Sequence, residues 1–499
     1  MAFCSGNASS MPSSAPGPPG PPGCEVRAVP SRGYGLFPSA QCTPGTQVFT
    51  DKPLFCMQHT GNRRLIASCA RCCAFIGSLQ QQLEVIFGEA RFAPMLAEVG
   101  DFVRRWDAEL LPGNCKGPGD VIGIRCSKGC GELYCSEACR DADFRHSHNL
   151  LCVGPIQTED HPLLRFKYHA LQHADTLLLV AQVFAHLVNR AKSLGGGAAT
   201  MRGLMMELMV FCNAPFGEAC RPPPGRNKDA EFAAHVEGLV NEAAELLRAS
   251  LALHAPLETT ALFEGGAEFF SRMLGLFEYN NIDVEVQSPF GQVVLNKGRE
   301  LVAAASSSPQ AAADLTKYER LLREKEWVMQ CTWGEETTGV YGEDPVATDD
   351  VSGNAETLLE DDATMDASGA AADEDFNAGI ANAAMAQARA AVNKLSLEQL
   401  AGARWPSLHG TAFFPSAARI NHSCVPNMKI EFPWNSSQLA AVAVRPVAAG
   451  EELCISYIKP EADVNTRRRQ LLEYGFVCSC ERCLQEDSGM VRRIQKRLK

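Results

Sequence analysis

The stretch Arg419-Ile420-Asn421-His422-Ser423-Cys424-Val425-Pro426-Asn427 combines a polar Asn-His-Ser turn with a cysteine and a proline. Downstream, Gly450-Glu451-Glu452-Leu453-Cys454-Ile455-Ser456-Tyr457 predicts a turn that leads into a strand ending in a tyrosine. Further on, Cys478, Cys480 and Cys483 supply three of the four ligands that a tetrahedral zinc site needs. Because thiolates this close repel one another without a cation, we predict a zinc ion with Cys424 as its fourth ligand. That ion would tie the polar turn to the C-terminal segment.

The composition is that of a globular protein with room for two or three structural units. The chain has 499 residues, of which 46% are hydrophobic and 21% are charged. The most apolar run, residues 176–188, is too short to span a membrane and predicts a buried helix. Residues 1–23 are rich in Pro, Gly and Ser and lack a signal sequence, which predicts a disordered tail. We therefore expect an intracellular protein of the cytoplasm, the nucleus or both, without a membrane partner.

The negative charge is concentrated in one segment. Residues 343–375 contain 12 acidic residues and no Lys or Arg, which equals the net charge of -12 for the whole chain. The rest of the chain is thus balanced, and nothing in it favours specific binding of nucleic acid. We expect the acidic segment to be a flexible linker, and a docking site for basic protein segments is the alternative.

A second group of cysteines predicts two further zinc sites. In an intracellular chain with 21 cysteines, paired spacings favour zinc over disulfides. Eight residues have such spacings, enough for two closed tetrahedral sites: Cys69, Cys72, Cys126, Cys130, Cys135, Cys139, His148 and Cys152. Cys73 or Cys115 could replace a neighbouring cysteine, and His146 could replace His148.

Periodicity outlines the remaining elements. Residues 24–56 predict short strands with glycine turns, and residues 439–444 and 453–457 predict strands that join them in one sheet system. Apolar residues at helical spacing predict a helical pair between Leu83 and Val103, helices from Pro162 to about Met273, and a helix over 315–328.

These features together resemble the SET and MYND domain family. The resemblance rests on the loop Arg32-Gly33-Tyr34-Gly35, the eight-ligand finger after it, and the Asn-His-Ser-Cys, tyrosine and triple-cysteine motifs near the C-terminus. It is greatest to the fifth SET and MYND domain protein, which lacks the C-terminal helical repeat domain of other members. The implied fold is α+β: a SET-domain β-fold interrupted by a MYND zinc finger and a helical insertion, with a zinc-bound post-SET segment.

The resemblance also implies an order of segments. These are a disordered N-terminal tail (1–23), the N-terminal part of the SET domain (24–60), a MYND finger (61–155) with a helical insert (74–125), a helical SET insertion (156–273), a SET catalytic core (274–457) with a long insert (291–395) containing the acidic linker (343–375), a post-SET zinc segment (458–485) and a basic tail (486–499).

The implied activity is transfer of a methyl group from S-adenosyl-L-methionine to lysine in a histone tail or another basic protein segment. The implied catalytic residues are Tyr457, Tyr474 and Phe476. Cofactor contacts are implied for Tyr457 and Phe476 and for five further residues: Arg32, Tyr34, Asn280, Asn421 and His422. Residues 274–284 resemble the family's strand in which an asparagine, here Asn280, meets the cofactor.

Three zinc ions are implied. In the finger, one would be bound by Cys69, Cys72, Cys135 and Cys139, and the other by Cys126, Cys130, His148 and Cys152. The third would be the Cys424, Cys478, Cys480 and Cys483 site. A finger of this kind implies docking of a proline-containing peptide.

Taken singly, these residues also fit structural roles, because an Asn-His pair can cap a turn and a strand tyrosine usually belongs to the core. Only their joint order favours an active site. The alternative function is a non-catalytic adaptor that recruits partners through the finger. A zinc-dependent hydrolase is disfavoured, because four protein ligands at each site leave no position for an activated water.

Overall fold

The computed structural model describes residues 20–30, 32–87, 93, 103–104, 123–220, 222, 230–333, 407–472 and 474–486. The acidic linker, Cys115 and most of the basic tail, the predicted disordered tail and the helical insert lie outside these residues. The chain forms two compact units, the first comprising residues 1–77, 112–288 and 406–499, and the second residues 78–111 and 289–405.

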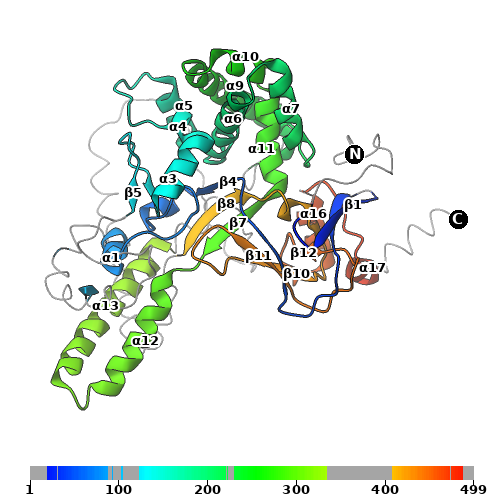
Figure 1. Ribbon diagram of the computed structural model, residues 1–499. Coiled ribbons are helices and arrows are strands. Elements are labelled where there is room, and N and C mark those ends of the chain that lie inside the picture. Colours follow the sequence, from blue (N-terminus) through cyan, green and yellow to red (C-terminus); the bar gives the residue numbers. More distant parts are fainter. Residues whose placement is uncertain are drawn as a thin grey trace, which may run out of the picture. The chain divides into compact units, whose positions relative to one another are not determined.

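The first unit contains two three-stranded sheets built from distant parts of the chain (Figure 1). One has the order β10-β11-β3, with β3 at Gln47–Asp51, β10 at Met428–Glu431 and β11 at Leu439–Ala443. The other has the order β4-β8-β7, with β4 at Phe55–Gln58, β7 at Asn281–Val286 and β8 at Leu408–Phe413. All neighbours in these two sheets are antiparallel. The pairing of β3 with β11 confirms that N- and C-terminal strands share a sheet.

Three strand pairs complete the β-structure of the described residues. The antiparallel hairpin of β1 (Cys24–Val29) and β2 (Gly33–Pro38) turns at Gly33, whose φ of 73° suits glycine. The short β9 (Asn421–His422) and β12 (Cys454–Ile455) are parallel, with Asn421 opposite Cys454. In the finger, β5 (Ile124–Arg125) pairs with β6 (Leu133–Tyr134).

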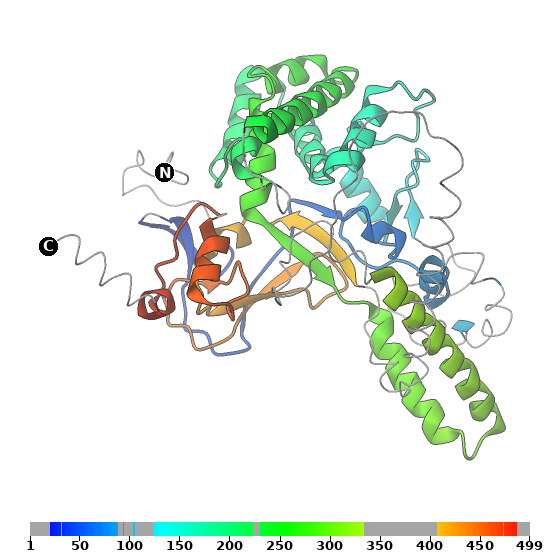
Figure 2. The same ribbon diagram turned by 180° about the vertical axis from the view of Figure 1, so that it is seen from behind.

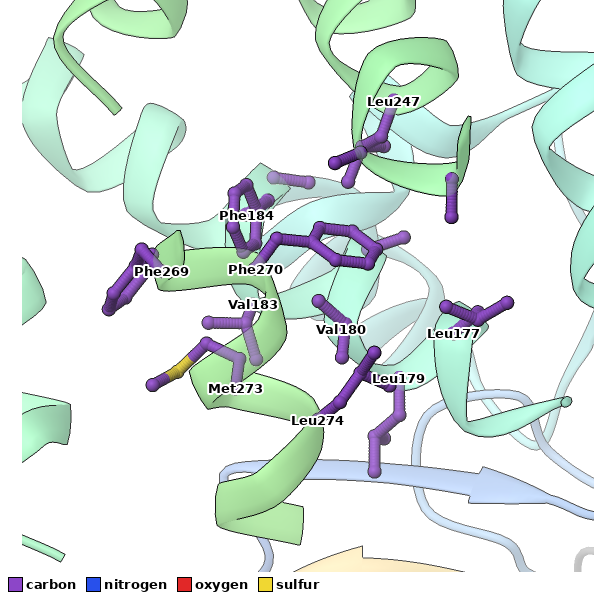
Figure 3. Close-up of a cluster of buried hydrophobic side chains, with 14 of the residues drawn as sticks. Leu177, Leu179, Val180, Val183, Phe184, Leu247, Phe269, Phe270, Met273 and Leu274 are labelled. Carbon is purple, nitrogen blue, oxygen red and sulfur yellow. The ribbon is translucent and has the colours of Figure 1, made fainter. Parts of the chain in front are cut away.

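A helical layer covers one side of the β4-β8-β7 sheet (Figure 1). Its helices are α5 (Pro162–His173), α6 (Thr176–Ser193), α7 (Ala198–Met209), α8 (Phe216–Ala219), α9 (Ala230–Ala252), α10 (Pro256–Leu262) and α11 (Glu268–Asn280). As Figure 3 shows, Phe184 of α6 and Phe270 of α11 meet in its core, with ring centroids 5.4 Å apart. The predicted buried helix over 176–188 is thus part of α6. Among the described residues, no helix is both long and apolar enough to cross a membrane.

One predicted strand is largely helical. Residues 268–280 form α11, and β7 begins only at Asn281, so the expected strand over 274–284 was wrong for most of its length. The reason is tertiary packing, because Phe270, Leu274 and Phe277 form a buried stripe at helical spacing against α6 and its neighbours. A Cβ at Gly275 would lie 2.0 Å from the carbonyl oxygen of Ala214, so only glycine permits this close approach of α11.

The second unit contains α1 (Leu79–Phe87), α12 (Pro289–Ala304) and α13 (Pro309–Trp333). The helix predicted over 315–328 lies within α13. The buried Tyr318 of α13 donates a hydrogen bond of 3.1 Å to the carbonyl of Val294 in α12. Gly298 makes room for this ring, since a Cβ there would lie 2.0 Å from the Tyr318 hydroxyl.

Candidate active site and metal centres

The first finger site joins residues 69–75, a loop after β4 that we call the knuckle, to the start of the short helix α3 (Glu137–Asp143). The Sγ atoms of Cys69, Cys72, Cys135 and Cys139 all lie within 4.8 Å of one another. Cys135 follows β6, and Cys139 lies in α3, whose N-cap Ser136 accepts a hydrogen bond from the Cys139 N–H. Four thiols so arranged are compatible with tetrahedral zinc.

The second finger site combines three thiols with an imidazole. Cys126, Cys130, His148 and Cys152 have ligand atoms within 4.8 Å of one another, and Nε2 of His148 lies 3.3 Å from Sγ of Cys126. His148 ends the helical turn η2 (Phe144–His148) and is buried. This donor set is also compatible with zinc and has no open position.

The alternative ligands lie elsewhere. The imidazole of His146 stacks on that of His186 in α6, with centroids 4.1 Å apart, and therefore belongs to the contact with the helical layer. Cys73 is buried but is not part of the four-thiol group that contains Cys72.

The finger is hydrogen-bonded to the loop between β10 and β11. The backbone N–H of Ser437 donates to the carbonyl of Cys72 at 2.7 Å, and the N–H of Phe75 donates to Oδ1 of Asn435 at 2.8 Å. The knuckle that carries two candidate zinc ligands is thus attached directly to the β10-β11-β3 sheet.

The third candidate metal centre connects the polar turn to the C-terminal segment. The Sγ atoms of Cys424, Cys478, Cys480 and Cys483 lie within 4.8 Å of one another. Figure 2 shows α16 (Val464–Leu472) and α17 (Glu481–Glu486), drawn in orange and red, at the same end of the first unit as the blue β1–β2 hairpin. The four thiols again form a closed donor set for zinc.

A fully buried arginine contacts this centre. Arg467 of α16 has no exposed surface, and its Nη2 donates to Sγ of Cys483 at 3.5 Å and to Glu486 at 2.8 Å. A zinc ion with four thiolates carries two net negative charges, so a cation beside it offsets part of the cost of burying them.

Four aromatic rings gather next to the third centre. The ring of Tyr457 lies 5.3 Å from that of Tyr474, 5.4 Å from His422 and 6.4 Å from Phe476, measured between centroids. The hydroxyl of Tyr457 donates to the carbonyl of Ile420 at 2.6 Å, and the hydroxyl of Tyr474 lies 3.4 Å from the carbonyl of Tyr457. The predicted catalytic residues therefore lie together, beside the predicted cofactor residue His422.

His422 connects the aromatic group to the metal centre. Its Nδ1 accepts a hydrogen bond of 3.0 Å from the backbone N–H of Tyr457, so the proton of the neutral ring must be on Nε2. Nε2 lies 3.3 Å from Sγ of Cys424 and donates to it. Burial, and secondarily the charge of Arg467, lower the pKa of His422 to about 4, which keeps the ring neutral.

Asn421, Arg32 and Tyr34 meet on the other side of the polar turn. Nδ2 of Asn421 donates to the carbonyl of Tyr34 at 3.1 Å and to Oε1 of Glu452 at 2.8 Å. Glu452 also forms an ion pair with Arg32. Residues 32–34 therefore lie next to the polar turn, although Tyr34 and Asn421 are 387 positions apart in the sequence.

Asn280 is placed differently from this group. It ends α11, and its Nδ2 donates to the carbonyls of Cys212 and Leu276 at 2.8 and 2.7 Å. The next residue, Asn281, begins β7 and has a buried Oδ1 without a hydrogen-bond partner in the described part of the chain. A buried acceptor without a partner is costly unless a ligand or water supplies a donor. Asn281 is thus a second candidate for the cofactor role predicted for Asn280.

Sequence reasoning missed three further residues of the site: Glu452, Arg467 and Asn427. The buried Asn427 donates to the carbonyl of Glu452 at 2.8 Å and accepts from the N–H of Cys454 at 2.7 Å, which fixes β12. Glu452 and Asn427 lie inside the quoted motifs, so their polarity was a usable signal. Nothing in the run of three arginines that contains Arg467 distinguishes the buried one.

The residues present fit S-adenosyl-L-methionine. This cofactor has an aromatic base, a carboxylate, an amine and a sulfonium, and the site offers aromatic rings, the cation of Arg32 and the amide of Asn421. At the start of β7, the buried Oδ1 of Asn281 has no partner among the described residues and needs a donor.

The chain is similar to a known domain family and to several known proteins. Residues 291–458 match the family model of the SET domain. "Histone-lysine N-methyltransferase ATXR2" of Arabidopsis thaliana is 23% identical over 94% of this chain and 91% of its own length. "Protein-lysine N-trimethyltransferase SMYD5" of Homo sapiens is 42% identical, but over 15% of this chain and 19% of its own length.

A third relative is likewise similar over only a short part of the chain. "Histone-lysine N-methyltransferase SET5" of Vanderwaltozyma polyspora is 43% identical over 15% of this chain and 14% of its own length. The chain thus carries a SET domain within a mixed α and β structure, and this domain and these relatives support a lysine methyltransferase activity.

Proposed function

We propose that the protein transfers methyl groups from S-adenosyl-L-methionine to lysine side chains in histone tails or other basic protein segments. One arrangement supports this proposal above all. Tyr457 is surrounded by Tyr474, Phe476 and His422, and His422 bonds both to Tyr457 and to the thiol of Cys424. Such a group would enclose a lysine side chain next to a cofactor.

The chemistry requires a neutral amine, whereas a free lysine is protonated with a pKa of about 10.4. The cofactor supplies a methyl group on a positively charged sulfur, which leaves as a neutral thioether when the amine attacks. The rings of Tyr457, Tyr474 and Phe476 would exclude water and disfavour the ammonium form, and the amine's proton passes to solvent. The hydroxyl of Tyr457, held by the carbonyl of Ile420, would help to align the acceptor nitrogen.

We assign the cofactor site to the polar turn and its neighbours. Asn421 and His422 would hold the cofactor from β9, with Arg32 and Tyr34 covering it and Phe476 forming part of the wall. Asn280 would bind the carboxylate end, and Oδ1 of Asn281 would accept a hydrogen bond from the cofactor's ammonium group. The fit is supported by the contacts of Asn421 with Tyr34 and by the orphaned oxygen of Asn281.

The three metal centres would be structural zinc sites. Each has four protein donors, so zinc there stabilises the chain path and leaves no position for a reacting water. We propose the first two as a MYND finger within residues 61–155, with the helical insert 74–125, and the third as the post-SET site within 458–485. The remaining segments would follow as an N-terminal SET part (24–60), a helical insertion (156–273) and a catalytic core (274–457).

A role in recruiting partners is the second candidate. A cavity of about 180 Å³ on the finger is lined by Cys126, Ser127, Arg140, Asp141, Phe144 and His148, and so lies beside two candidate zinc ligands. In this mostly polar lining, Phe144 would be the side chain to contact a proline-containing peptide. If recruitment were the sole function, the protein would bind peptides but not S-adenosyl-L-methionine.

The deciding experiment combines binding and turnover. Wild-type protein is titrated calorimetrically with S-adenosyl-L-methionine and then incubated with the labelled cofactor and histones or other basic proteins. We expect binding and methyl incorporation, and we expect Tyr457→Phe to remove most incorporation while the protein stays folded. Tyr168→Phe is the matched control, since Tyr168 is 61% exposed on α5. Incorporation by Tyr457→Phe equal to wild type would contradict the assigned site, and absence of cofactor binding would favour the adaptor.

A further inference from the structure

Glu452 lies where three segments of the candidate cofactor site meet. One carboxylate oxygen pairs with Arg32 in the turn between β1 and β2, and the other accepts a hydrogen bond of 2.8 Å from Asn421 in β9. The side chain of Glu452 is 16% exposed, whereas that of Arg32 is 42% exposed. A largely buried carboxylate thus holds a more exposed cation, which also interacts with the thiol of Cys454.

The backbone fixes Glu452 on both sides. The N–H of Leu453 donates to the carbonyl of Leu36 in β2 at 2.8 Å, and the amide of Asn427 donates to the carbonyl of Glu452 at 2.8 Å. Cys454 then pairs with Asn421 in the parallel register of β12 and β9. The backbone that carries the carboxylate is therefore held in place by the sheet and by Asn427.

The space around this carboxylate depends on a glycine. A Cβ at Gly35 would lie 2.9 Å from Oε1 of Glu452 and 3.3 Å from Nδ2 of Asn421. Both distances are too short for an unperturbed contact, and Cγ2 of Val29 would also lie 2.9 Å away, so an alanine would displace the two polar groups and press on Val29. The second glycine of the Arg-Gly-Tyr-Gly loop thus makes room for the Glu452–Asn421 hydrogen bond.

We propose that Glu452 is a positioning residue for binding of S-adenosyl-L-methionine. It holds Arg32 and Asn421 in place before the cofactor arrives, so that the turn of residues 32–34 need not be ordered at the moment of binding. This inference rests on the proposed function, which assigns Arg32, Tyr34 and Asn421 to the cofactor. Ordering an arginine side chain on binding is costly, and an ion pair that orders it beforehand removes that cost.

The test measures cofactor-product binding directly. Full-length wild type, Glu452→Ala, Glu452→Gln and Gly35→Ala are titrated calorimetrically with S-adenosylhomocysteine, and the melting temperature of each is measured without ligand. We expect Glu452→Ala and Gly35→Ala each to raise Kd by about tenfold or more. The first variant loses the ion pair with Arg32, and the second disturbs the hydrogen bond between Glu452 and Asn421. Glu452→Gln keeps an acceptor for Asn421 and should give an intermediate Kd.

A kinetic comparison separates positioning from catalysis. For Glu452→Gln, KM for S-adenosyl-L-methionine should rise while kcat at saturating cofactor stays close to wild type. Glu207→Gln is the matched control, because Glu207 in α7 pairs with Arg190 of α6 at 2.6 Å and is not among the proposed cofactor residues. That variant should bind S-adenosylhomocysteine like wild type.

The outcomes are distinct. A Kd for Glu452→Ala within about twofold of wild type would overturn the positioning role. If Glu452→Ala does not fold, Glu452→Gln decides, since it removes the charge that pairs with Arg32 but keeps the side-chain volume and an acceptor for Asn421. Wild type that binds no S-adenosylhomocysteine contradicts the proposed function, and with it this inference. Wild type that binds while every variant behaves normally contradicts the positioning role alone.

Discussion

The backbone N–H of Tyr457 donates a hydrogen bond of 3.0 Å to Nδ1 of His422. The other ring nitrogen of His422 faces the thiol of Cys424 at 3.3 Å, so one imidazole links the candidate catalytic tyrosine to a candidate zinc ligand. A histidine in this position fixes the orientation of both partners, in the way that outer groups orient metal ligands generally. Metal binding and activity should therefore depend on each other in this protein.

Replacing His422 should affect both properties. His422→Ala removes the acceptor for Tyr457 and the donor to Cys424. We expect zinc to be lost to a chelator at an about 10- to 100-fold lower chelator concentration, together with a loss of most methyl transfer. Zinc release can be followed with a colorimetric chelator, and His235→Ala on the exposed side of α9 is the control. Retention of zinc at the wild-type level would contradict the link.

Removing one ligand of the third centre should remove one metal ion. Cys480→Ser leaves three thiols, so we expect the zinc content to fall from three ions per chain to two. Tyr474 and Phe476 then lose their anchor, and activity should disappear. Metal analysis by mass spectrometry gives the stoichiometry, and Cys212→Ser, which changes a cysteine outside the three groups, should retain three ions. A content of three in Cys480→Ser would exclude Cys480 as a ligand.

Arg467 should stabilise the same centre by its charge. Arg467→Met keeps much of the side-chain volume but leaves the thiolates and Glu486 without their buried cation. We expect a loss of about 3–5 kcal/mol in the free energy of unfolding. Denaturant titration measures it, and Arg469→Met, an exposed residue of the same helix, should change little. An unchanged free energy of unfolding in Arg467→Met would show that the charge is not needed.

Asp175 should contribute to stability in a defined pH range. Its carboxylate accepts hydrogen bonds from His59 and from the N–H of Thr60, both at 3.2 Å. Although burial alone would raise it, these interactions hold the pKa of Asp175 below its usual 3.8. Because the folded-state pKa is depressed, this stabilisation is present above pH 3.8 and is lost as the pH falls through the folded-state value.

The corresponding variant is Asp175→Asn. We expect it to cost about 1–2 kcal/mol at neutral pH and to make stability less dependent on pH in the acid range. Denaturant midpoints measured from pH 7 down to the acid limit of solubility test this, with the exposed Asp160→Asn as control. A constant difference between wild type and Asp175→Asn at every pH would contradict the assignment.

The contact between finger and sheet should be measurable. Asn435→Ala removes the acceptor for the N–H of Phe75, which we expect to cost about 1 kcal/mol of stability. It should also speed proteolysis of the finger, because one hydrogen bond of the finger to the loop between β10 and β11 is lost while that of Ser437 to Cys72 remains. The exposed Asn465→Ala serves as control. Equal cleavage rates for all three proteins would show that the contact is not stabilising.

Much of the site was predictable because its chemistry is local in sequence. The spacing of Cys478, Cys480 and Cys483 brings three thiols together in almost any folded conformation, so the need for a cation follows from the sequence. The distant partner Cys424 was predictable because one more ligand was required. The strand predicted over 274–284 failed because its apolar spacing fits a buried helix as well as a strand, and only packing against α6 decided between them.

The sequence by itself determined the three groups of metal ligands, the tyrosine and the Asn-His pair, since each is defined by residue type and spacing. Only the tertiary structure decided that Arg467 is buried, that Oδ1 of Asn281 has no partner in the described part of the chain, and that Glu452 joins Arg32 to Asn421. The physical reason is that burial and hydrogen bonding between segments hundreds of residues apart depend on how sheets and helices pack. No local pattern records that packing.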